Sequence, residues 1–381
     1  MKKKRLLIFV DWFLPGFKAG GQLQSCANLV AAIQNDSEVF MITSDRDLGD
    51  ATGYPDITPN TWLTRESIKV YYASPGNLSY KTIRLLIAYV KPDSVYLNSM
   101  FSFYFTILPI AVCANTSSIH AKIVLAPRGM LHQGALQFKR IKKQFFLRSF
   151  KLLNLHSKII FHATDKTEKD DIKKFFGKNA SIDFVPDFPQ GNQKPLQKLK
   201  KEVGNLKCIF VSRISEKKNL LFLLELLAKI NNASIQLTIV GPIETPEYWE
   251  KCKQQIARLP SNIQVDYTGP IPNSTLPETY AQHHLFVLTT HGENFGHVIF
   301  ESLINGRPVL ISDQTPWQRL QEKQVGWDID LKASDQFIKA IESAANWEQE
   351  TFDQYCNNCW HYAENYIQSS TLKQDYLTLL G

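Results

Sequence analysis

The sequence has little of what would place it in a specialised class of protein. Its 381 residues include only six cysteines, scattered except for the pair Cys356 and Cys359, so a disulfide scaffold is excluded and a reducing cytoplasm fits best. Glycine and proline number 18 each, beside 44% hydrophobic residues, which excludes collagen-like and disordered chains. The composition is that of a folded protein, and its length predicts two domains.

Long apolar runs are also scarce. Residues 6–10 follow a basic start but end at Asp11, which makes them too short for the apolar region of a signal peptide. Residues 95–114 are the only charge-free stretch near membrane-spanning length, and they are interrupted by Asn98, Ser99, Ser102 and Pro109. We therefore interpret this stretch as a buried strand, a turn and a core helix.

Acidic residues are absent from residues 94–164. The same stretch holds nine basic residues, namely Lys122, Arg128, Lys139, Arg140, Lys142, Lys143, Arg148, Lys151 and Lys158. Since the net charge of the whole chain is +7, the rest of the sequence is slightly acidic and the basicity forms one patch. Such a patch predicts an anionic partner, which could be phosphate, nucleic acid or membrane lipid.

Within this basic stretch, residues 138–153 have helical periodicity. As a helix they would separate an apolar face from a basic face, with Phe138, Ile141, Phe145 and Leu152 opposite Lys139, Arg140, Lys143 and Lys151. That pattern fits docking on an anionic membrane surface, and it equally fits a core helix with a solvated basic face. The aromatic cluster at residues 101–105 favours a core position over a ligand site.

Short apolar runs alternate with helical patterns along the chain, which indicates parallel βαβ units. We expect strands at residues 6–10, 39–43, 70–73, 95–97, 123–126, 159–162 and 182–185, and again at 208–212, 237–240, 265–268, 285–289 and 308–312. The periodicity lapses at residues 186–202, which we predict to be a linker. The sequence thus predicts an α/β protein with two Rossmann-like, doubly wound parallel-sheet domains facing a cleft. They would comprise residues 1–190 and 191–360, with a C-terminal helix at residues 361–381 able to cross back to the first domain.

The strongest motif lies at residues 289–301, where a predicted strand runs into a predicted helix. Glu293 and Glu301 flank the start of that helix, up to ~12 Å apart at ~1.5 Å per residue, and the amides near Gly296 and His297 form an anion site. A nucleotide sugar fits this arrangement. The alternative, with Glu293 as a helix cap and Glu301 as a solvated residue, stays open.

Two further motifs follow the first strand of each domain. Arg213 and Lys218 stand where a diphosphate can be held, although an ordinary charged loop would have the same sequence. Gly20 and Gly21 open a helix and allow the backbone to approach a ligand closely, or they simply make a tight turn. The sequence lacks G-x-G-x-x-G and a Walker loop, which disfavours nicotinamide binding and a P-loop.

Together these motifs resemble the retaining family 4 glycosyltransferases of the GT-B fold, of the type that assembles bacterial glycans. The resemblance covers nearly the whole chain and depends on the order and spacing of its pieces. These are Gly20-Gly21, Leu97-Asn98-Ser99, Ala126-Pro127-Arg128-Gly129, His162-Ala163-Thr164, Arg213 with Lys218, Val240-Gly241-Pro242, Pro308 to Asp313, and above all Glu293 and Glu301 with seven residues between them.

The resemblance implies a hexosyltransferase that moves a sugar from a UDP- or GDP-sugar to a glycan or lipid-linked acceptor. Transfer would retain the anomeric configuration and would need neither a metal nor another cofactor. Surface polysaccharide or lipopolysaccharide biosynthesis is the setting in which similar bacterial sequences act. Residues 1–190 would then be the acceptor domain and residues 191–360 the nucleotide-sugar donor domain.

The resemblance also implies roles for the matching residues. Arg213 and Lys218 would stabilise the leaving nucleotide diphosphate in place of a metal ion, and losing one such contact costs a few kcal/mol. Glu293 would bind the donor sugar and Glu301 the ribose. The other expected donor contacts are Gly20 and Gly21, the amides of Gly296, His297 and Val298, and Gly241, Pro242 and Ile271 near the base. Arg128 stands where many relatives have a histidine, so its contact with sugar, diphosphate or acceptor stays open.

Two other functions fit parts of this sequence. A nucleotide-sugar epimerase would share the fold, and a nucleic-acid-binding protein could use the basic patch, although zinc-finger and RNP motifs are missing. Cys356 and Cys359 with His361, and the group His283, His284, His291 and His297, lack the ligand set of a metal site. We therefore expect no metal and no nucleic-acid partner. The protein is expected in the cytoplasm, peripheral on the inner face of the membrane where the basic patch meets lipid.

Overall fold

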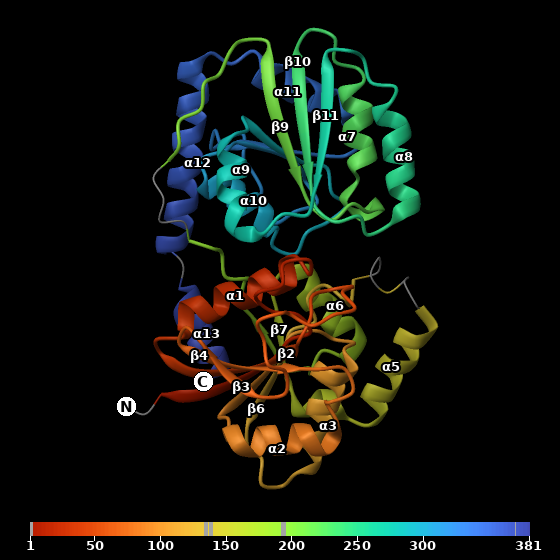
Figure 1. Cartoon of the computed structure of the whole chain (residues 1–381), viewed down its shortest axis with the longest axis vertical. Helices are drawn as coiled ribbons and strands as arrows, with labels where there is room; N and C mark the ends of the chain where they lie inside the picture. The colour runs from red at the N-terminus through yellow and green to blue at the C-terminus, as the bar shows by residue number, and fades with distance from the viewer. Residues whose placement is uncertain (1–2, 133–135, 137–139, 192–195, 370) are drawn as a thin grey trace. The chain divides into compact units, whose positions relative to one another are not determined.

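The computed structural model describes residues 3–132, 136, 140–191, 196–369 and 371–381, and Figure 1 shows their course. Contacts between residues divide them into two compact units. The first unit contains the described residues up to Phe188 together with Thr371–Gly381, and the second unit contains those from Pro189 to residue 369. The chain thus leaves the first unit after Phe188 and returns to it at Thr371.

The first unit is built on an eight-stranded sheet in the order β3-β4-β2-β1-β5-β6-β7-β8. Its strands are β1 (Lys4–Phe9), β2 (Ser37–Ser44), β3 (Trp62–Arg65), β4 (Ile68–Ala73), β5 (Ser94–Leu97), β6 (Lys122–Leu125), β7 (Ile160–Ala163) and β8 (Ile182–Phe184). Every pairing is parallel except that of β3 with β4 at the edge. Leu7, Ile8 and Phe9 of the central strand are completely buried, because helices cover both faces of such a sheet.

The helices of the first unit are α1 (Gly21–Ile33), α2 (Tyr80–Val90), α3 (Leu108–Asn115), α5 (Arg140–Leu152), α6 (Lys166–Phe176) and α13 (Leu372–Leu380). Helix α13, which comes from the far end of the chain, packs against α1 (Figure 1). It buries Tyr376, whose ring contacts those of His162 and Phe188 at 5.3 and 5.6 Å. These contacts explain why the last residues of the chain belong to the first unit.

The second unit has a six-stranded, wholly parallel sheet in the order β11-β10-β9-β12-β13-β14. Its strands are β9 (Asn205–Val211), β10 (Ser234–Val240), β11 (Ile263–Gly269), β12 (Leu285–Leu288), β13 (Val309–Ser312) and β14 (Gly326–Ile329). Its helices are α7 (Leu220–Leu227), α8 (Pro246–Ile256), α9 (Leu276–Ala281), α10 (His297–Ile304), α11 (Ser334–Ala345) and α12 (Gln349–Ser369). Helix α7 packs with α8 and α11, and α10 packs with α9 and α12 (Figure 1).

Both units are therefore doubly wound parallel α/β domains, as the sequence predicted, and every expected strand is present within a few residues. Their borders differ from the expected ones: the second unit starts two residues earlier, and the returning segment starts at Thr371 rather than at residue 361. The reason is that α12 belongs to the second core, into which it places Phe352, Cys356 and Cys359.

Residues 95–114 form β5, a π-helical turn at Phe103–Ile107 and α3. Among the residues that the structure describes, no helix is both long and apolar enough to cross a bilayer. The expectation that the aromatic cluster here is core holds for Phe105 but is wrong for Phe103 and Tyr104, which are 56% and 45% exposed. The π-turn directs these two rings outward, where they contact each other edge to face at 5.2 Å.

The predicted amphipathic helix is present as α5, but its orientation differs from that of an ordinary core helix. Ile141, Phe145 and Leu152 are exposed, while Leu147 and Phe150 are buried. The reason is aromatic packing on the opposite side, where Phe146 contacts Phe101 at 5.4 Å. Phe138 and Lys139, which the sequence also assigned to this helix, lie outside the described residues.

Candidate functional site

The second unit brings Lys218 and Glu293 together. Lys218 ends a short 3-10 turn (Glu216–Lys218) after β9, and Glu293 lies in the loop between β12 and α10. Because β9 and β12 are neighbours in a parallel sheet, their carboxyl ends open onto the same edge. The Nζ atom of Lys218 lies 2.5 Å from Oε1 of Glu293, and each side chain is only 12% exposed.

Hydrogen bonds hold these two loops against each other. The hydroxyl of Thr289 donates to the carbonyl of Asn219 at 2.8 Å, and the N–H of His291 donates to the carbonyl of Lys217 at 2.8 Å. Thr290 donates to the same Lys217 carbonyl at 3.2 Å. Since three bonds join the loops on either side of the ion pair, the positions of the carboxylate and the ammonium are set by backbone as well as by side chains.

The charges at this edge favour an ionised carboxylate. Burial acts to raise the pKa of Glu293, but the charge and hydrogen bond of Lys218, the charge of Lys217 and a bond from Thr290 outweigh it and lower that pKa. Desolvation of its ammonium lowers the pKa of Lys217, although the residue is partly exposed; the charge of Glu293 opposes this effect, and those of Lys218 and Arg213 add to it. Two cations, Lys218 and Lys217, thus act directly on the Glu293 carboxylate.

Arg213 and Lys218, which the sequence motif groups together, bind different carboxylates in the structure. The Nη1 atom of Arg213 lies 2.5 Å from Oε1 of Glu244, and the two side chains are 40% and 43% exposed. Such a solvated pair contributes little to stability, so the guanidinium can change partners at small cost. The sequence analysis missed Glu244, although its place just after β10, the strand beside β9, is a signal that could have found it.

Gly241 sets the path of the loop that carries Arg213. Its φ is +138°, and a Cβ atom there would lie 2.0 Å from the carbonyl oxygen of Ser212. The N–H of Ser212 donates to the carbonyl of Val240, and that of Ile214 donates to the carbonyl of Pro242, at 3.0 and 2.9 Å. The ends of β9 and β10 therefore approach each other so closely that only glycine fits.

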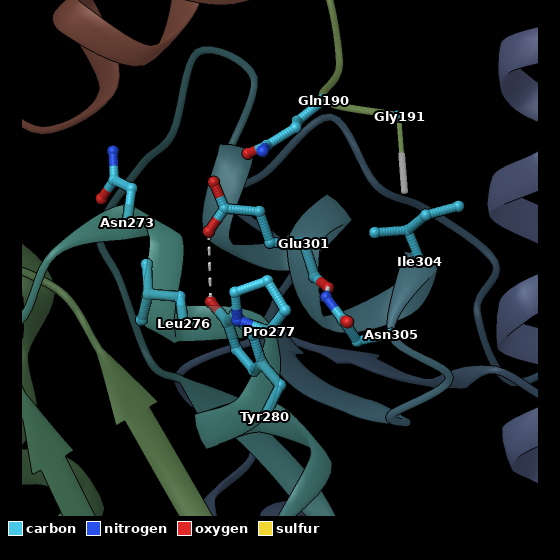
Figure 2. A pocket seen from close by; sticks show the side chains of 9 residues that line it. All are labelled: Gln190, Gly191, Asn273, Leu276, Pro277, Tyr280, Glu301, Ile304 and Asn305. Atoms are coloured by element: carbon cyan, nitrogen blue, oxygen red, sulfur yellow. Dashed lines mark hydrogen bonds between the residues drawn. The ribbon is translucent and has the colours of Figure 1, made fainter. Parts of the chain in front are cut away.

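Glu301 lies on α10 and lines a pocket of the second unit, as Figure 2 shows. The pocket encloses about 320 Å³ including space open to solvent, and its other lining residues are Gln190, Gly191, Asn273, Leu276, Pro277, Tyr280, Ile304 and Asn305. The hydroxyl of Tyr280 shares its proton between the carbonyl of Val298 at 3.2 Å and Oε2 of Glu301 at 3.4 Å. Burial raises the pKa of Glu301 to about 7 despite this bond. The residue is half-buried, and its role as a ribose contact stays a prediction.

The sequence analysis did not identify Tyr280, Asn273 or Asn305 as residues near Glu301. The expected base contacts Pro242 and Ile271 are not among the described residues that line this pocket. Ile271 instead packs, partly buried, against the core of the second unit.

The start of α10 carries no side-chain cap, and its capping position is Gly296 with a φ of +78°. A Cβ atom on Gly296 would lie 2.8 Å from the side chain of Ile299. His297 is buried and its ring contacts that of Phe295 at 4.8 Å, while the carbonyl of Val298 accepts from Tyr280 at 3.2 Å. The first amides of a helix have no acceptor within it, so Gly296, His297 and Val298 supply the N-terminal end of a helix dipole.

The remaining predicted residues lie in the first unit. Gly20, with a φ of +66°, precedes α1, and Gly21 is the first residue of that helix. No heavy atom lies within 4 Å of a Cβ built on Gly20, so its conformation, and not close packing, explains the glycine.

Arg128 is buried in a closed network. Its Nη1 atom pairs with Asp187, its Nε donates to Oδ1 of Asn98 at 2.5 Å, and its Nη2 donates to the hydroxyl of Tyr96 at 2.9 Å. The side chains of Arg128 and Asp187 are each 6% exposed. The sequence expected Arg128 to contact a substrate, and that role stays a prediction beside the partners that the structure shows.

His162 extends this network in its neutral form. Its Nε2 lies 2.7 Å from the carbonyl oxygen of Val185, which only accepts, so Nδ1 accepts from the Tyr96 hydroxyl at 2.8 Å. Burial, with the nearby charge of Arg128, lowers the pKa of His162 to about 4. The network therefore ties β5 and β7 to the last residues of the first unit before the chain leaves it.

Two of the histidines considered as metal ligands, His283 and His284, form hydrogen bonds within the second unit. His283 bonds to Thr279 and Thr238, and His284 bonds to the backbone of Lys207 and Lys200. In the part of the chain that the structure describes, no three His, Cys, Asp or Glu side chains gather as a metal site would require.

Residues 192–365, which lie in the second unit, match the sequence family described as "Glycosyl transferases group 1". No curated protein sequence matches the chain.

Solved structures match both units together. Anabaena Alr3699/HepE in complex with UDP and glucose is 15% identical, with 99% of each chain covered and a TM-score of 0.72. The sucrose-phosphate synthase from Thermosynechococcus elongatus is also 15% identical, with 99% of this chain and 98% of that chain covered and a TM-score of 0.72. WaaG, a glycosyltransferase involved in lipopolysaccharide biosynthesis, is 13% identical, with 98% of each chain covered and a TM-score of 0.61. At these identities the matches establish a shared two-domain fold.

Proposed function

We propose that this chain, which has the GT-B fold and whose residues 192–365 match the group 1 glycosyl transferases, moves a sugar from a nucleotide diphosphate sugar to an acceptor hydroxyl. The ion pair between Lys218 and Glu293 is the observation that carries the proposal. It places a carboxylate able to accept bonds from sugar hydroxyls directly beside an ammonium able to hold a phosphate.

The donor would lie along the carboxyl edge of the second sheet. Lys218 and the exchangeable Arg213 face its diphosphate, and Glu293 accepts from hydroxyls of the transferred sugar. The N-terminal end of α10, with Gly296, His297 and Val298, adds a positive dipole at the phosphates. Glu301, which lies on α10 and lines the pocket described above, accepts hydrogen bonds from the ribose hydroxyls.

Departure of the nucleotide diphosphate is the step that these cations assist. Negative charge grows on the phosphate oxygen as the bond to the anomeric carbon breaks, and fixed cations stabilise that charge without reorganising. Lys218 is fixed by its partner and by the loop bonds around it, so it is suited to this task. In the proposed reaction the acceptor oxygen bonds to the anomeric carbon on the face that the phosphate leaves, and the hydroxyl proton passes to the departing phosphate oxygen. The configuration is retained and no metal is required.

We further propose a class of donor and a biosynthetic setting, both supported by the similar solved structures. HepE was solved with UDP and glucose, which supports a UDP-sugar donor, with a GDP-sugar as the alternative. WaaG is described as acting in lipopolysaccharide biosynthesis, which supports a glycan or lipid-linked acceptor in surface polysaccharide assembly at the cytoplasmic face of a membrane. The first unit would then bind the acceptor.

A donor panel and one substitution test this function. Thermal unfolding is followed with different nucleotide sugars, since a donor at 100 times its dissociation constant stabilises the protein by about 2.7 kcal/mol. Glu293→Gln should abolish transfer from the donor so identified. Because the variant leaves Lys218 without its buried partner, its unfolding temperature without ligand should fall, so transfer is assayed below that temperature. The matched control is Glu225→Gln, which makes the same change at an exposed carboxylate of α7. Full transfer by Glu293→Gln would sink the proposal, and conversion of the donor alone to a new nucleotide sugar would favour an epimerase.

A further inference from the structure

Helix α5 presents an apolar stripe to solvent. Ile141, Phe145 and Leu152 are 85%, 72% and 87% exposed, and Leu153, just after the helix, is 66% exposed. The first three are spaced by four and seven residues, so they lie on one side of the helix. Soluble proteins scatter single exposed apolar residues, whereas a contiguous apolar stripe marks a surface that is covered by a partner.

The stripe faces outward because the other side of α5 is anchored. Phe146 contacts the ring of Phe101 at 5.4 Å, and Phe150 contacts that of Phe176 at 5.8 Å. Leu147 is buried beside them. Rotating the helix to bury Phe145 would pull these aromatic side chains out of the core, so the exposure of the stripe is a fixed property of the first unit.

Cations surround the stripe. Arg140, Lys142, Arg148 and Lys151 are all exposed, and Arg148 follows Ile141 by seven residues, which places it on the same side. Lys143 is turned the other way, with its Nζ atom 5.2 Å from the ring centroid of Phe101. No acidic residue occurs anywhere in α5 or in the whole stretch from residue 94 to 164.

We propose that this outward face of α5 docks on the surface of an anionic lipid bilayer. The stripe of Ile141, Phe145 and Leu152 enters the boundary between headgroups and acyl chains, and the surrounding lysines and arginines bind the lipid phosphates. The helix has 13 residues, about 20 Å at ~1.5 Å per residue, so it lies in the plane of the interface and does not span it. This inference goes beyond the proposed function and does not depend on it.

The charge pattern decides between lipid and a second copy of the chain. A two-fold dimer through this stripe would place α5 against α5, and every charged residue on both helices would be positive. Like charges brought together in an interface cost several kcal/mol. An anionic bilayer satisfies the apolar stripe and the cations together, because it offers acyl chains beneath a layer of phosphates.

Vesicle binding by the full chain tests the proposal. The protein is sedimented with vesicles of phosphatidylcholine containing phosphatidylglycerol and, separately, with vesicles of phosphatidylcholine alone. Binding is expected only to the anionic vesicles, and it should weaken as salt is added. Equal binding to both vesicles, or none to the anionic ones, would overturn the proposal.

Two variants separate the apolar and the charged contributions. Phe145→Ser with Leu152→Ser should lower the partition coefficient about tenfold or more, because both side chains leave the acyl boundary. Lys142→Gln with Lys151→Gln should lower it about fivefold for each charge removed. Both pairs are exposed, so thermal unfolding should stay close to that of the natural protein.

A matched control uses apolar residues of similar exposure elsewhere. Leu85 on α2 and Val203 in the second unit are 58% and 60% exposed, and Leu85→Ser with Val203→Ser should bind vesicles as the natural protein does. If this control loses as much binding as the α5 variant, α5 is not the docking site. If sedimentation velocity shows a dimer that Phe145→Ser with Leu152→Ser dissociates while vesicle binding persists, a second copy covers the stripe and the proposal is overturned.

Discussion

Lys218 and Glu293 come from two different loops and meet at 2.5 Å on the carboxyl edge of the second sheet. Each is the other's main electrostatic partner, so the acidity of the carboxylate depends on the lysine. Under the proposed function, the same lysine also faces the donor diphosphate. A single cation thereby links the group that orients the sugar to the group that leaves.

Removing the Lys218 cation should change both the rate of sugar transfer and the pKa of Glu293. Lys218→Met is expected to lower kcat/KM for transfer about a hundredfold or more, as loss of a fixed charge at a departing phosphate does. The pKa of Glu293 should rise, because burial raises it and the main opposing charge is gone. The acid limb of the pH–rate profile should therefore move to higher pH. Lys229→Met, which removes an exposed cation, is the control, and an unmoved acid limb in Lys218→Met would contradict this coupling.

Nucleotide affinity should depend on pH through Glu301. Its pKa of about 7 means that the carboxyl is mostly neutral at about pH 6 and mostly ionised at about pH 8. Ribose hydroxyls donate to the ionised form, so affinity for the free nucleotide should rise up to about tenfold across that range, with release of a proton on binding. Calorimetry in buffers of different ionisation enthalpy measures both quantities. If nucleotide affinity in Glu301→Gln changed with pH as steeply as in the natural protein, the pH dependence would come from another group.

The raised pKa of Glu301 also predicts how the free energy of unfolding depends on pH. Its folded pKa lies above the ordinary value of 4.5, so its contribution is fully present below about pH 4.5 and is lost as pH rises through about 7. Glu301→Gln should remove that loss and gain up to about 3 kcal/mol at pH 8 relative to the natural protein, since one pKa unit corresponds to about 1.4 kcal/mol. Denaturant unfolding at several pH values without ligand checks this, and parallel stability curves for the two proteins would contradict it.

Gly241 should tolerate no side chain. Gly241→Ala is expected to destabilise the second unit by about 3 kcal/mol or more, because its Cβ would overlap the Ser212 carbonyl. Gly204→Ala is the control: it also has a positive φ, but no atom lies within 4 Å of its Cβ, so it should cost only about 1–2 kcal/mol. Denaturant unfolding measures both, and equal losses would mean that backbone conformation, not the close approach, explains Gly241.

Arg128 should matter to the stability of the first unit. Arg128→Met leaves Asp187 buried without its cation, which typically costs about 3–5 kcal/mol, and Arg128→Met with Asp187→Leu should recover part of that loss. Nucleotide binding by the second unit should not change in either variant. A folded and fully stable Arg128→Met that loses only transfer would instead return Arg128 to the substrate contact that the sequence suggested.

The strands could be predicted because parallel sheets covered on both faces need short, almost wholly apolar runs. β12 and β13 are buried along their whole length, and both were expected. β3 was missed because Trp62–Arg65 is a short edge strand with only half-buried and exposed residues. β14 was missed because Gly326–Ile329 contains a glycine and an aspartate within four residues, which weakens any strand pattern.

Site residues that come soon after the end of a predicted strand could be identified from the sequence. Lys218 and Glu293 were both identified, but their direct pairing was not, because no local pattern indicates a contact across 75 positions. Asp187, 59 positions from Arg128, was missed for the same reason, whereas Glu244 follows the end of a predicted strand and could have been found. For α5 the helix was predictable from its period, whereas the direction of its apolar face depends on Phe101 and Phe176, which are distant in sequence.

The return of the chain to the first unit at Thr371 makes the second unit a single uninterrupted insertion. One stretch of gene therefore encodes every residue proposed to select the nucleotide and the sugar, apart from Gly20, Gly21 and Arg128. Recombination that replaces this stretch would exchange donor specificity in one event. The surface formed by α5 and the fold of the first unit, including the α13 segment that completes it, would be inherited unchanged.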